Sequence, residues 1–304
     1  MLTEIYCEVD DYCKWFEQEI RVRSLSDRQT IRRGLPGLCL SEVLTLLIFY
    51  HLSHYKTFKH FYLEKALPEL RADFPRLPAY NHFIELVPGA LVPLLGFLEH
   101  RCRHGERTGK YFIDSSALPV CHPKRAHQNR VFKGFAAWGK TSVGWFFGLK
   151  YHLVINQMGE LVGFSITPGS VADNDLRVLQ GLTEGLFGWL FGDKGYLMNA
   201  QKRAAVERGG QLQVISKKRK SMKSAPKTTL EQRLWLAKRG IIESVIDIQK
   251  HGCDIAHSRH RSPVNAFVNI LAALAAYSFL SRKPAVSVKA PLFINQPIDL
   301  AKAA

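Results

Sequence analysis

Three acidic residues stand where carboxylates could support metal-dependent chemistry. Asp114 and Asp193 each end a short apolar strand of the predicted fold, and Glu243 lies on a predicted helix. A carboxylate just beyond a buried strand is costly unless it binds a cation or accepts hydrogen bonds. Three converging carboxylates would suit Mg²⁺, which prefers oxygen ligands. Two such ions about 4 Å apart can hold the attacking and leaving oxygens of a phosphoryl transfer.

A purely structural role for these acids is the alternative to a catalytic one. An aspartate after a strand is usually an ordinary cap or turn residue, and 26 acids allow many chance triples. The helix around Glu243 favours chemistry, because Arg239, Glu243, Asp247 and Lys250 share one helical face. Such a stripe is also typical of a solvated ladder of ion pairs. On this helix, the shared face would direct Glu243 and the two cations toward the phosphate backbone of a bound nucleic acid.

The charge of the chain points to a polyanionic partner. The sequence has 42 Lys and Arg against 26 Asp and Glu, a formal net charge of +16. Residues 1–110 carry 15 basic and 14 acidic residues, so the remaining 27 basic and 12 acidic residues place almost all of the excess after residue 110. Nucleic acid or an anionic membrane would match this charge. With 46% hydrophobic residues, disorder is excluded as the main state.

Two regions with different patterns are predicted. Residues 1–105 indicate an all-helical domain that binds DNA or dimerises, with a helix over 41–61 capped by Ser41 and two short helices over 80–99. It could contain a helix-turn-helix, or be a small bundle docked on the rest. Residues 106–282 form the second domain, and 283–304 an irregular tail.

The second region reads as an α/β domain with a mixed sheet. Short apolar strands, a hairpin and amphipathic helices follow one another. The predicted elements are strands 111–115, 149–156 and 161–167, helix 173–184, strand 189–191, helix 199–208, strand 212–215 and helix 229–250. This order is compatible with an RNase H-like sheet flanked by helices.

Further cations are candidates for phosphate contacts. The run Lys217–Lys227 has six basic residues and no acid, which is also typical of a solvated loop. Lys140 and Lys150 flank the aromatic residues 145–147, which could stack on unpaired bases, although Phe146 and Phe147 are also typical of core positions. A basic cluster precedes the last apolar helix. The predicted DNA-binding residues are Arg239, Lys250, Lys194, Lys140, Lys217, Lys218, Arg219, Lys220, Arg259 and Arg261.

Cysteines and apolar runs give expectations about location. The six cysteines have no CxxC spacing and the first residues do not resemble a secretory signal, so we expect reduced thiols in a cytoplasm. A zinc site from Cys121, His122 and His127 has little support from spacing. The apolar runs 44–50 and 264–280 are too short or too polar for membrane spans, so we expect buried helices and no membrane.

Six segments together resemble the DDE transposases of bacterial insertion sequences. They occur in the family's order and cover about residues 110–280: FIDSSALPVC (112–121), FKGFAAWGKTSVGWFFGLKYHL (132–153), TPGSVADND (167–175), LFGDKGY (190–196), KRGIIESVIDIQK (238–250) and HSRHRSPVNAFVNILAALAAY (257–277). One large group of the family carries Tyr-x2-Arg-x3-Glu-x6-Lys. Arg239, Glu243 and Lys250 match it, whereas Leu236 stands at the tyrosine position, which indicates a related subgroup.

The resemblance implies an RNase H-like core in which Asp114, Asp193 and Glu243 bind two divalent ions, normally Mg²⁺, with Mn²⁺ as a substitute. It implies cleavage of double-stranded DNA at transposon terminal repeats and attack of the 3′-OH on target DNA. It further implies a homo-oligomer on DNA in a bacterial, nucleoid-associated setting. Two alternatives stay open: a metal-dependent nuclease on the same core, and a domesticated DNA-binding protein without chemistry.

Overall fold

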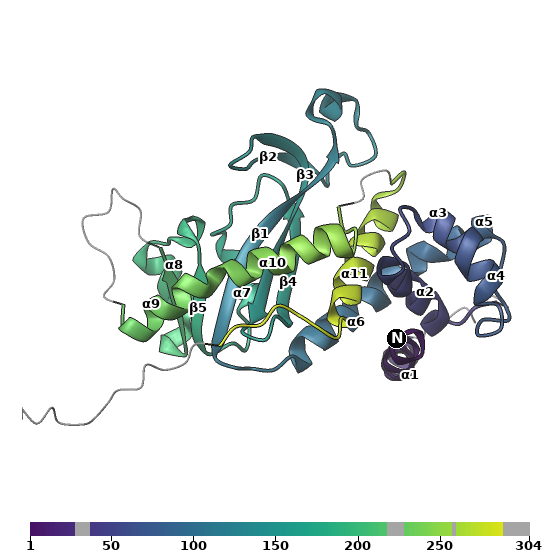
Figure 1. Cartoon of the computed structure of the whole chain (residues 1–304), viewed down its shortest axis with the longest axis horizontal. Coiled ribbons are helices and arrows are strands. Elements are labelled where there is room, and N and C mark those ends of the chain that lie inside the picture. The colour runs from purple at the N-terminus through teal and green to yellow at the C-terminus, as the bar shows by residue number, and fades with distance from the viewer. Residues whose placement is uncertain (28–36, 218–227, 257–259, 288–304) are drawn as a thin grey trace, which may run out of the picture.

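A mixed sheet of six strands forms the centre of the second half of the chain (Figure 1). The computed structural model describes residues 1–27, 37–217, 228–256 and 260–287. Within these, the strands are β1 (Lys110–Cys121), β2 (Ala137–Lys140), β3 (Trp145–Asn156), β4 (Leu161–Pro168), β5 (Gly188–Gly192) and β6 (Leu212–Ser216). The order across the sheet is β2-β3-β1-β5-β6, and β4 also pairs with β3.

The directions of the strands identify the fold. β3 is antiparallel to β1, β2 and β4, whereas β1, β5 and β6 run parallel to one another. The hairpin predicted over 149–167 forms, with its turn at Gln157–Glu160. The parallel strands β5 and β6 are joined by a helical crossover, whereas the chain passes from β1 to β5 through β2, β3, β4 and a helix. The α/β class with an RNase H-like mixed sheet is therefore confirmed, although the short strand β2 was not predicted.

Helices cover both faces of the sheet. On one face lie α9 (Leu230–Ala237) and α10 (Ile241–Asp247), and Trp235 of α9 approaches the ring of Phe112 on β1. On the other face lie α7 (Leu176–Leu182) and α8 (Ala200–Glu207), which pack with Ile113 of β1 in a second core. Alternate residues of β1 thus belong to different cores, as the two-residue period of a strand dictates.

The first 105 residues are helical, as predicted. Within the described part, their α-helices are α1 (Leu2–Asp27), α2 (Leu40–Leu52), α3 (Phe58–Phe61), α4 (Leu67–Glu69), α5 (Tyr80–Leu86) and α6 (Leu91–His104). Both α2 and α6 pack against α11 (Pro263–Ser278), the apolar helix near the end of the chain. One continuous core consequently joins this region to the face of the sheet that carries α9 and α10.

Two details of the N-terminal prediction were wrong. The helix expected over 41–61 stops at Leu52, because His54 takes a left-handed conformation (φ 57°) and a new helix begins only after the N-cap Thr57. Ser41 is not the N-cap of α2. That residue is Cys39, whose N–H donates to the Glu42 carboxylate (2.6 Å), while the Ser41 hydroxyl donates to Asp10 on α1 (2.8 Å).

Two helices of the second region also differ from the prediction. α7 begins at Leu176 rather than 173, because the carboxylate of Asp175 caps it by accepting N–H groups of its first turn. The long helix predicted over 229–250 is divided by a 3-10 turn, Lys238–Gly240, and passes into a π turn at Ile248. Gly240 is a poor helix former, which explains a break at this position.

The most apolar helices lie largely inside the protein or pack against other elements. α2 and α11, which contain the two runs considered in the sequence, are largely buried in the protein core. Among the described residues, the helical run Tyr80–His104 is long and apolar enough to cross a membrane by length and composition alone. Core helices pass the same test, and α6 within this run packs against α11 and β4.

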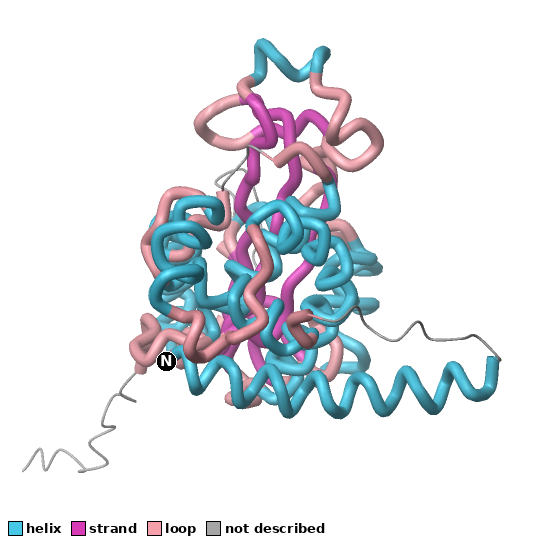
Figure 2. The backbone as a smooth tube through the Cα atoms, turned by 90° about the vertical axis from the view of Figure 1, so that its right-hand side faces the viewer, coloured by secondary structure: helices cyan, strands magenta, loops and turns pink. Residues whose placement is uncertain are grey.

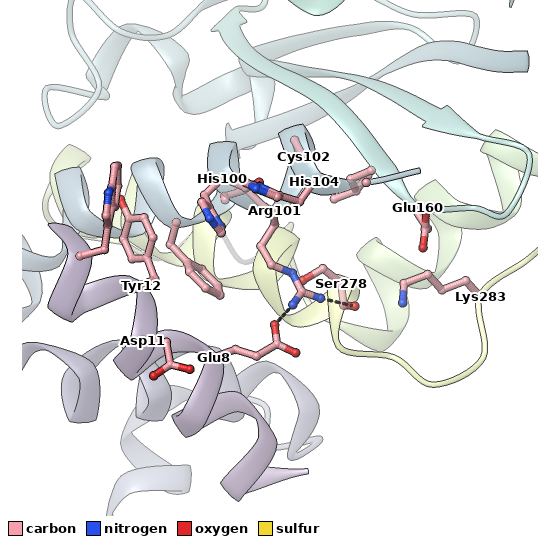
Figure 3. A pocket seen from close by; sticks show the side chains of 15 residues that line it. Glu8, Asp11, Tyr12, His100, Arg101, Cys102, His104, Glu160, Ser278 and Lys283 are labelled. Atoms are coloured by element: carbon pink, nitrogen blue, oxygen red, sulfur yellow. Dashed lines mark hydrogen bonds and ion pairs between the residues drawn. The ribbon is translucent and has the colours of Figure 1, made fainter. Parts of the chain in front are cut away.

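A cavity of about 580 Å³ marks the junction between the helical region and the sheet (Figure 3). It lies between α1, α6 and the end of α11. The guanidinium of Arg101 crosses it, pairing with Glu8 of α1 and donating to the carbonyl oxygen of Ser278 (3.1 Å). The same group lies 4.5 Å from the ring centroid of Phe279. Arg101 thus connects three separate segments.

Replacing Arg101 by alanine is expected to lower the free energy of unfolding by about 1–3 kcal/mol, because a partly buried carbonyl and a carboxylate lose their charged partner. Arg103→Ala is the matched control, since its side chain is 76% exposed and 3.9 Å from Glu99. The control should change stability by less than about 0.5 kcal/mol. Urea unfolding of both variants measures this, and equal losses would contradict a fastening role for Arg101.

Candidate active site

Asp114 lies within a strand rather than at its end. It is the fifth residue of β1, which continues to Cys121 and pairs with β3 through Asp114↔Leu153 and beyond. The expectation that Asp114 ends a strand was therefore wrong. The polar residues Ser115 and Ser116 suggested an end, but the Ser115 hydroxyl is satisfied by a hydrogen bond to Asp173 (2.6 Å), so the strand tolerates it.

The parallel register of β1 and β5 brings Asp114 and Asp193 next to each other. Phe112 of β1 is aligned with Phe191 of β5, and each aspartate lies two residues farther along its strand. Asp193 does end its strand as predicted: it caps the 3-10 turn Lys194–Tyr196, and its Oδ1 accepts the N–H of Gly195 (2.6 Å). Two carboxylates therefore meet at one edge of the parallel strands.

Arg239 connects the third acid to this pair. Its Nη1 donates to Asp114 Oδ2 (3.2 Å) and its Nη2 to Glu243 Oε1 (2.6 Å). The guanidinium is 13% exposed, whereas the Glu243 side chain is 61% exposed at the start of α10. The break at Lys238–Gly240 places Arg239 just before α10, one turn ahead of Glu243. The arginine thus lies between carboxylates of the strand and the helix.

The electrostatics of Asp114 reflect its crowded position. Its pKa is raised to about 6, chiefly by burial and also by the charges of Asp193 and Glu243, while the Ser115 N–H and Arg239 act in the opposite direction. A carboxylate that is desolvated and next to two other acids is stabilised by a nearby cation. In the structure that cation is Arg239.

The three acids fit a divalent metal by their chemistry, since all their donors are carboxylate oxygens. The mutual repulsion that raises the pKa of Asp114 is what a metal ion would relieve. Among the described residues, however, no three acidic, histidine or cysteine side chains are close enough to share an ion as they stand. Arg239 explains this, because it takes one oxygen each of Asp114 and Glu243. Cys121, His122 and His127, which were considered for a zinc site, also do not form such a group of three metal-binding side chains among the described residues.

A polar network lies on the opposite face of β1. Asp173 Oδ1 accepts hydrogen bonds from Ser115 Oγ (2.6 Å) and from Lys150 Nζ (3.0 Å), and these bonds outweigh burial to lower the pKa of Asp173. A side chain on Gly195 would meet Asp173 Oδ2 at 3.3 Å and Asp193 Oδ1 at 2.9 Å. The network therefore supports the turn that holds Asp193.

Sequence reasoning missed this network. The segment TPGSVADND was recognised as part of a family pattern, but no role was given to Asp173. Lys150 was placed beside the aromatic residues 145–147, whereas its ammonium binds Asp173 and the carbonyl oxygen of Val171. The strand alternation around Asp114 was the available signal, because it puts Ser115 and Lys150 on the face away from Phe147.

Stability should depend on pH through His152, which is fully buried beside Lys150 and Asp173. Burial lowers its pKa from 6.5 to about 4, so the neutral ring is favoured in the folded state. This contribution is complete above pH 6.5 and is lost as pH falls through 4, by at most roughly 3 kcal/mol.

We expect His152→Gln to flatten the pH dependence of the free energy of unfolding between these two values, measured by urea titration. The matched variant His251→Gln removes an imidazole that is 77% exposed, and should keep the wild-type slope. If both variants keep that slope, His152 does not govern it.

The predicted DNA-binding residues that the structure describes lie on several different elements. Lys194 is exposed directly after Asp193, and Lys250 is half-buried in the π turn after α10, where burial lowers its pKa. Lys140 is exposed at the end of β2, Lys217 is exposed after β6, and Arg261 precedes α11. Lys218, Arg219, Lys220 and Arg259 lie outside the described residues.

Comparison with known families covers the sheet and the site. A family model described as a transposase DDE domain matches residues 104–263, just over half of the chain. The matched span runs from the end of α6 to the first residue of α11 and includes Asp114, Asp193 and Glu243. A search of curated proteins gives no match.

Proposed function

Since this chain belongs to the family of proteins with a transposase DDE domain, we propose that it is an insertion-sequence transposase that cuts DNA at transposon ends and joins the 3′-OH to target DNA. The observation that carries this proposal is the convergence of the acids. Asp114 and Asp193 occupy equivalent positions on neighbouring parallel strands, and Arg239 links Asp114 to Glu243 of α10. The net charge of +16 supports a DNA substrate.

Asp114, Asp193 and Glu243 are the residues that would hold divalent ions, Mg²⁺ or Mn²⁺. When bound, two such ions would activate the attacking oxygen and stabilise the leaving oxygen. Arg239 donates to one oxygen each of Asp114 and Glu243, so full access of ions to these carboxylates would require the guanidinium to turn away from them. It would then be free to pair with a phosphate of the substrate, as guanidinium groups do readily.

The proposed reaction has two balanced steps. Water attacks the phosphorus of the scissile phosphodiester, the bond to the 3′ oxygen breaks, and that oxygen leaves as a 3′-OH after protonation. The 3′-OH then attacks a phosphodiester of target DNA, forming one P–O bond as another breaks. Lys194, which is exposed and next to Asp193, would contact the phosphates that carry the developing charge.

The remaining parts of the proposal concern assembly and location. Joining two transposon ends to one target requires two active sites, so we propose a homo-oligomer on DNA. We also propose that the protein works in a bacterial cytoplasm in association with the nucleoid. Analytical ultracentrifugation with and without DNA ends tests the first, and a fluorescent fusion in cells tests the second.

The decisive experiment is cleavage and joining of labelled DNA that carries the ends of the element, with Mg²⁺ or with EDTA. Metal-dependent nicks and joined products, both absent from Asp193→Ala, are expected. Nicks without joining would instead identify a nuclease on the same core. Tight binding by a folded protein without metal-dependent chemistry would identify a DNA-binding protein that has lost catalysis.

A further inference from the structure

An arm extends from one end of the sheet, and its loop contacts α11 where the ring of Phe135 meets that of Phe267 (5.8 Å between centroids). We define the arm as residues 122–145: the 3-10 turn Pro123–Gln128, the loop after it, strand β2 and the turn into β3. Figure 2 shows the long strands continuing past the helices into this part of the chain. β1, which carries Asp114, leads directly into the arm, and β3 leads back from it. The arm and Asp114 are therefore on the same pair of neighbouring strands.

The arm carries positive charge without any negative charge. No acidic residue occurs between Asp114 and Glu160. The exposed cations of the arm are Lys124, Arg125, Arg130, Lys133 and Lys140. None of these five forms an ion pair with another described residue. A surface of this kind is complementary to a polyanion and repels a second copy of the arm.

The arm also exposes large apolar side chains. Trp145 is 62% exposed and Val143 is 96% exposed at the turn between β2 and β3, and Trp138 is 45% exposed next to them. The ammonium of Lys140 lies 5.6 Å from the ring centroid of Trp145. Phe146, in contrast, is buried. Exposed aromatic side chains combined with cations match the chemistry of DNA, which offers phosphates together with sugar and base surfaces.

The register of the strands fixes where the arm lies relative to the acids. Asp114 is directly opposite Leu153, and Trp145 lies eight residues before Leu153 on β3. Because eight is even, Trp145 and Asp114 are on the same face of the sheet. At roughly 3.3 Å per residue, the turn lies ~26 Å from the acids. Duplex DNA rises 3.4 Å per base pair, so this separation spans about 8 base pairs.

We propose that the arm binds duplex DNA about 8 base pairs from the phosphodiester that is cut. Lys140 and the neighbouring cations contact phosphates, and Trp145 packs against the sugars at the edge of a groove. The arm thereby sets the minimum length of DNA that must flank the cut for full affinity. This inference rests on the proposed function, because it takes the acids as the cutting site.

The test compares DNA binding by wild type and by the double variant Lys140→Ala, Trp145→Ala. The DNA has either about 4 or about 14 base pairs on each side of the cut, chosen to fall short of the arm or to pass it. We expect the variant to bind the long DNA about tenfold or more weakly. Its salt dependence should be shallower by about 0.9 per lost phosphate contact. On the short DNA, wild type and variant should bind equally.

A matched control removes a cation and an exposed aromatic side chain elsewhere. Arg177→Ala with Phe187→Ala takes an exposed cation from α7 and a 48% exposed aromatic side chain from the loop before β5. It should bind both DNAs like wild type. Hydroxyl-radical footprinting of the wild-type complex shows which base pairs the protein protects, and it requires no variant. Protection about 8 base pairs from the cut is expected in addition to protection at the cut.

Three results would overturn the arm proposal. The first is an equal loss of affinity on short and long DNA, and the second is a footprint confined to the cut. The third is unchanged binding of the long DNA by the variant; if self-association in ultracentrifugation is altered as well, the arm is a contact between copies of the chain. DNA binding and footprinting do not depend on cleavage, so they test the arm alone. The metal-dependent cleavage assay tests the proposed function, and a failure there would be distinguished from a failure of the arm proposal.

Discussion

Replacing Asp193 by asparagine is expected to abolish DNA cleavage while the protein stays folded and still binds DNA. Asparagine keeps the size of the side chain, and its carbonyl oxygen can still accept the N–H of Gly195. It removes the negative charge that a divalent ion requires. The loss of several kcal/mol of transition-state stabilisation corresponds to a decrease in rate of about 10³-fold or more. Asp114→Ala and Glu243→Ala should lose cleavage for the same reason.

The matched control for Asp193→Asn is Asp175→Asn. Asp175 is an acid in the nearby loop that serves as the N-cap of α7, a position that asparagine fills equally well. This variant should retain cleavage within about a factor of two or three, as expected for a substitution that costs under 0.5 kcal/mol. Rates of nicking of labelled DNA and binding by gel shift give both readings. Substantial cleavage by Asp193→Asn would remove Asp193 from the catalytic group.

Replacing Arg239 by glutamine is expected to change metal binding and cleavage in opposite directions. Without DNA, the guanidinium competes with a metal for oxygens of Asp114 and Glu243. Hydrogen bonds between charged groups contribute about 1.5–3 kcal/mol, so their removal should raise metal affinity about tenfold or more. Cleavage should nevertheless fall by about 10²-fold, because a cation beside the reacting phosphate is lost.

Calorimetric titration of the DNA-free protein with Mn²⁺ measures the first effect, and nicking of labelled DNA measures the second. Lys238→Gln is the matched control, since it removes an exposed neighbouring cation that has no contact with the acids. It should leave metal affinity unchanged. Metal affinity that is unchanged or lower in Arg239→Gln would show that the arginine does not occupy the place of the metal. Unchanged cleavage would show that it does not act on the substrate.

The linkage of metal binding to Arg239 has a consequence for the resting protein. The pair of contacts gives Asp114 and Glu243 a positively charged partner when no metal is bound, which offsets part of the repulsion among the acids in the folded chain. A buried carboxylate without such a partner would be costly. The same residue can therefore stabilise the DNA-free protein and contact the substrate in the complex, at different times.

The amino-acid sequence by itself determined the elements and the three acids. Strand alternation and caps depend on neighbouring residues, so the hairpin of β3 and β4, strands β5 and β6, and the start of α9 at Thr229 were predicted from local patterns. The acids were recognised because each lies in a short motif in the order of a known family.

Only the tertiary structure decided how these parts combine. Asp114 and Asp193 are neighbours because Phe112 and Phe191 are in register, a pairing between segments 79 positions apart. Arg239 bridges Asp114 and Glu243 because the predicted helix breaks at Gly240, and Asp173 joins the site through Ser115 from 58 positions away. Contacts of this kind depend on how distant segments pack, and no local pattern encodes that packing.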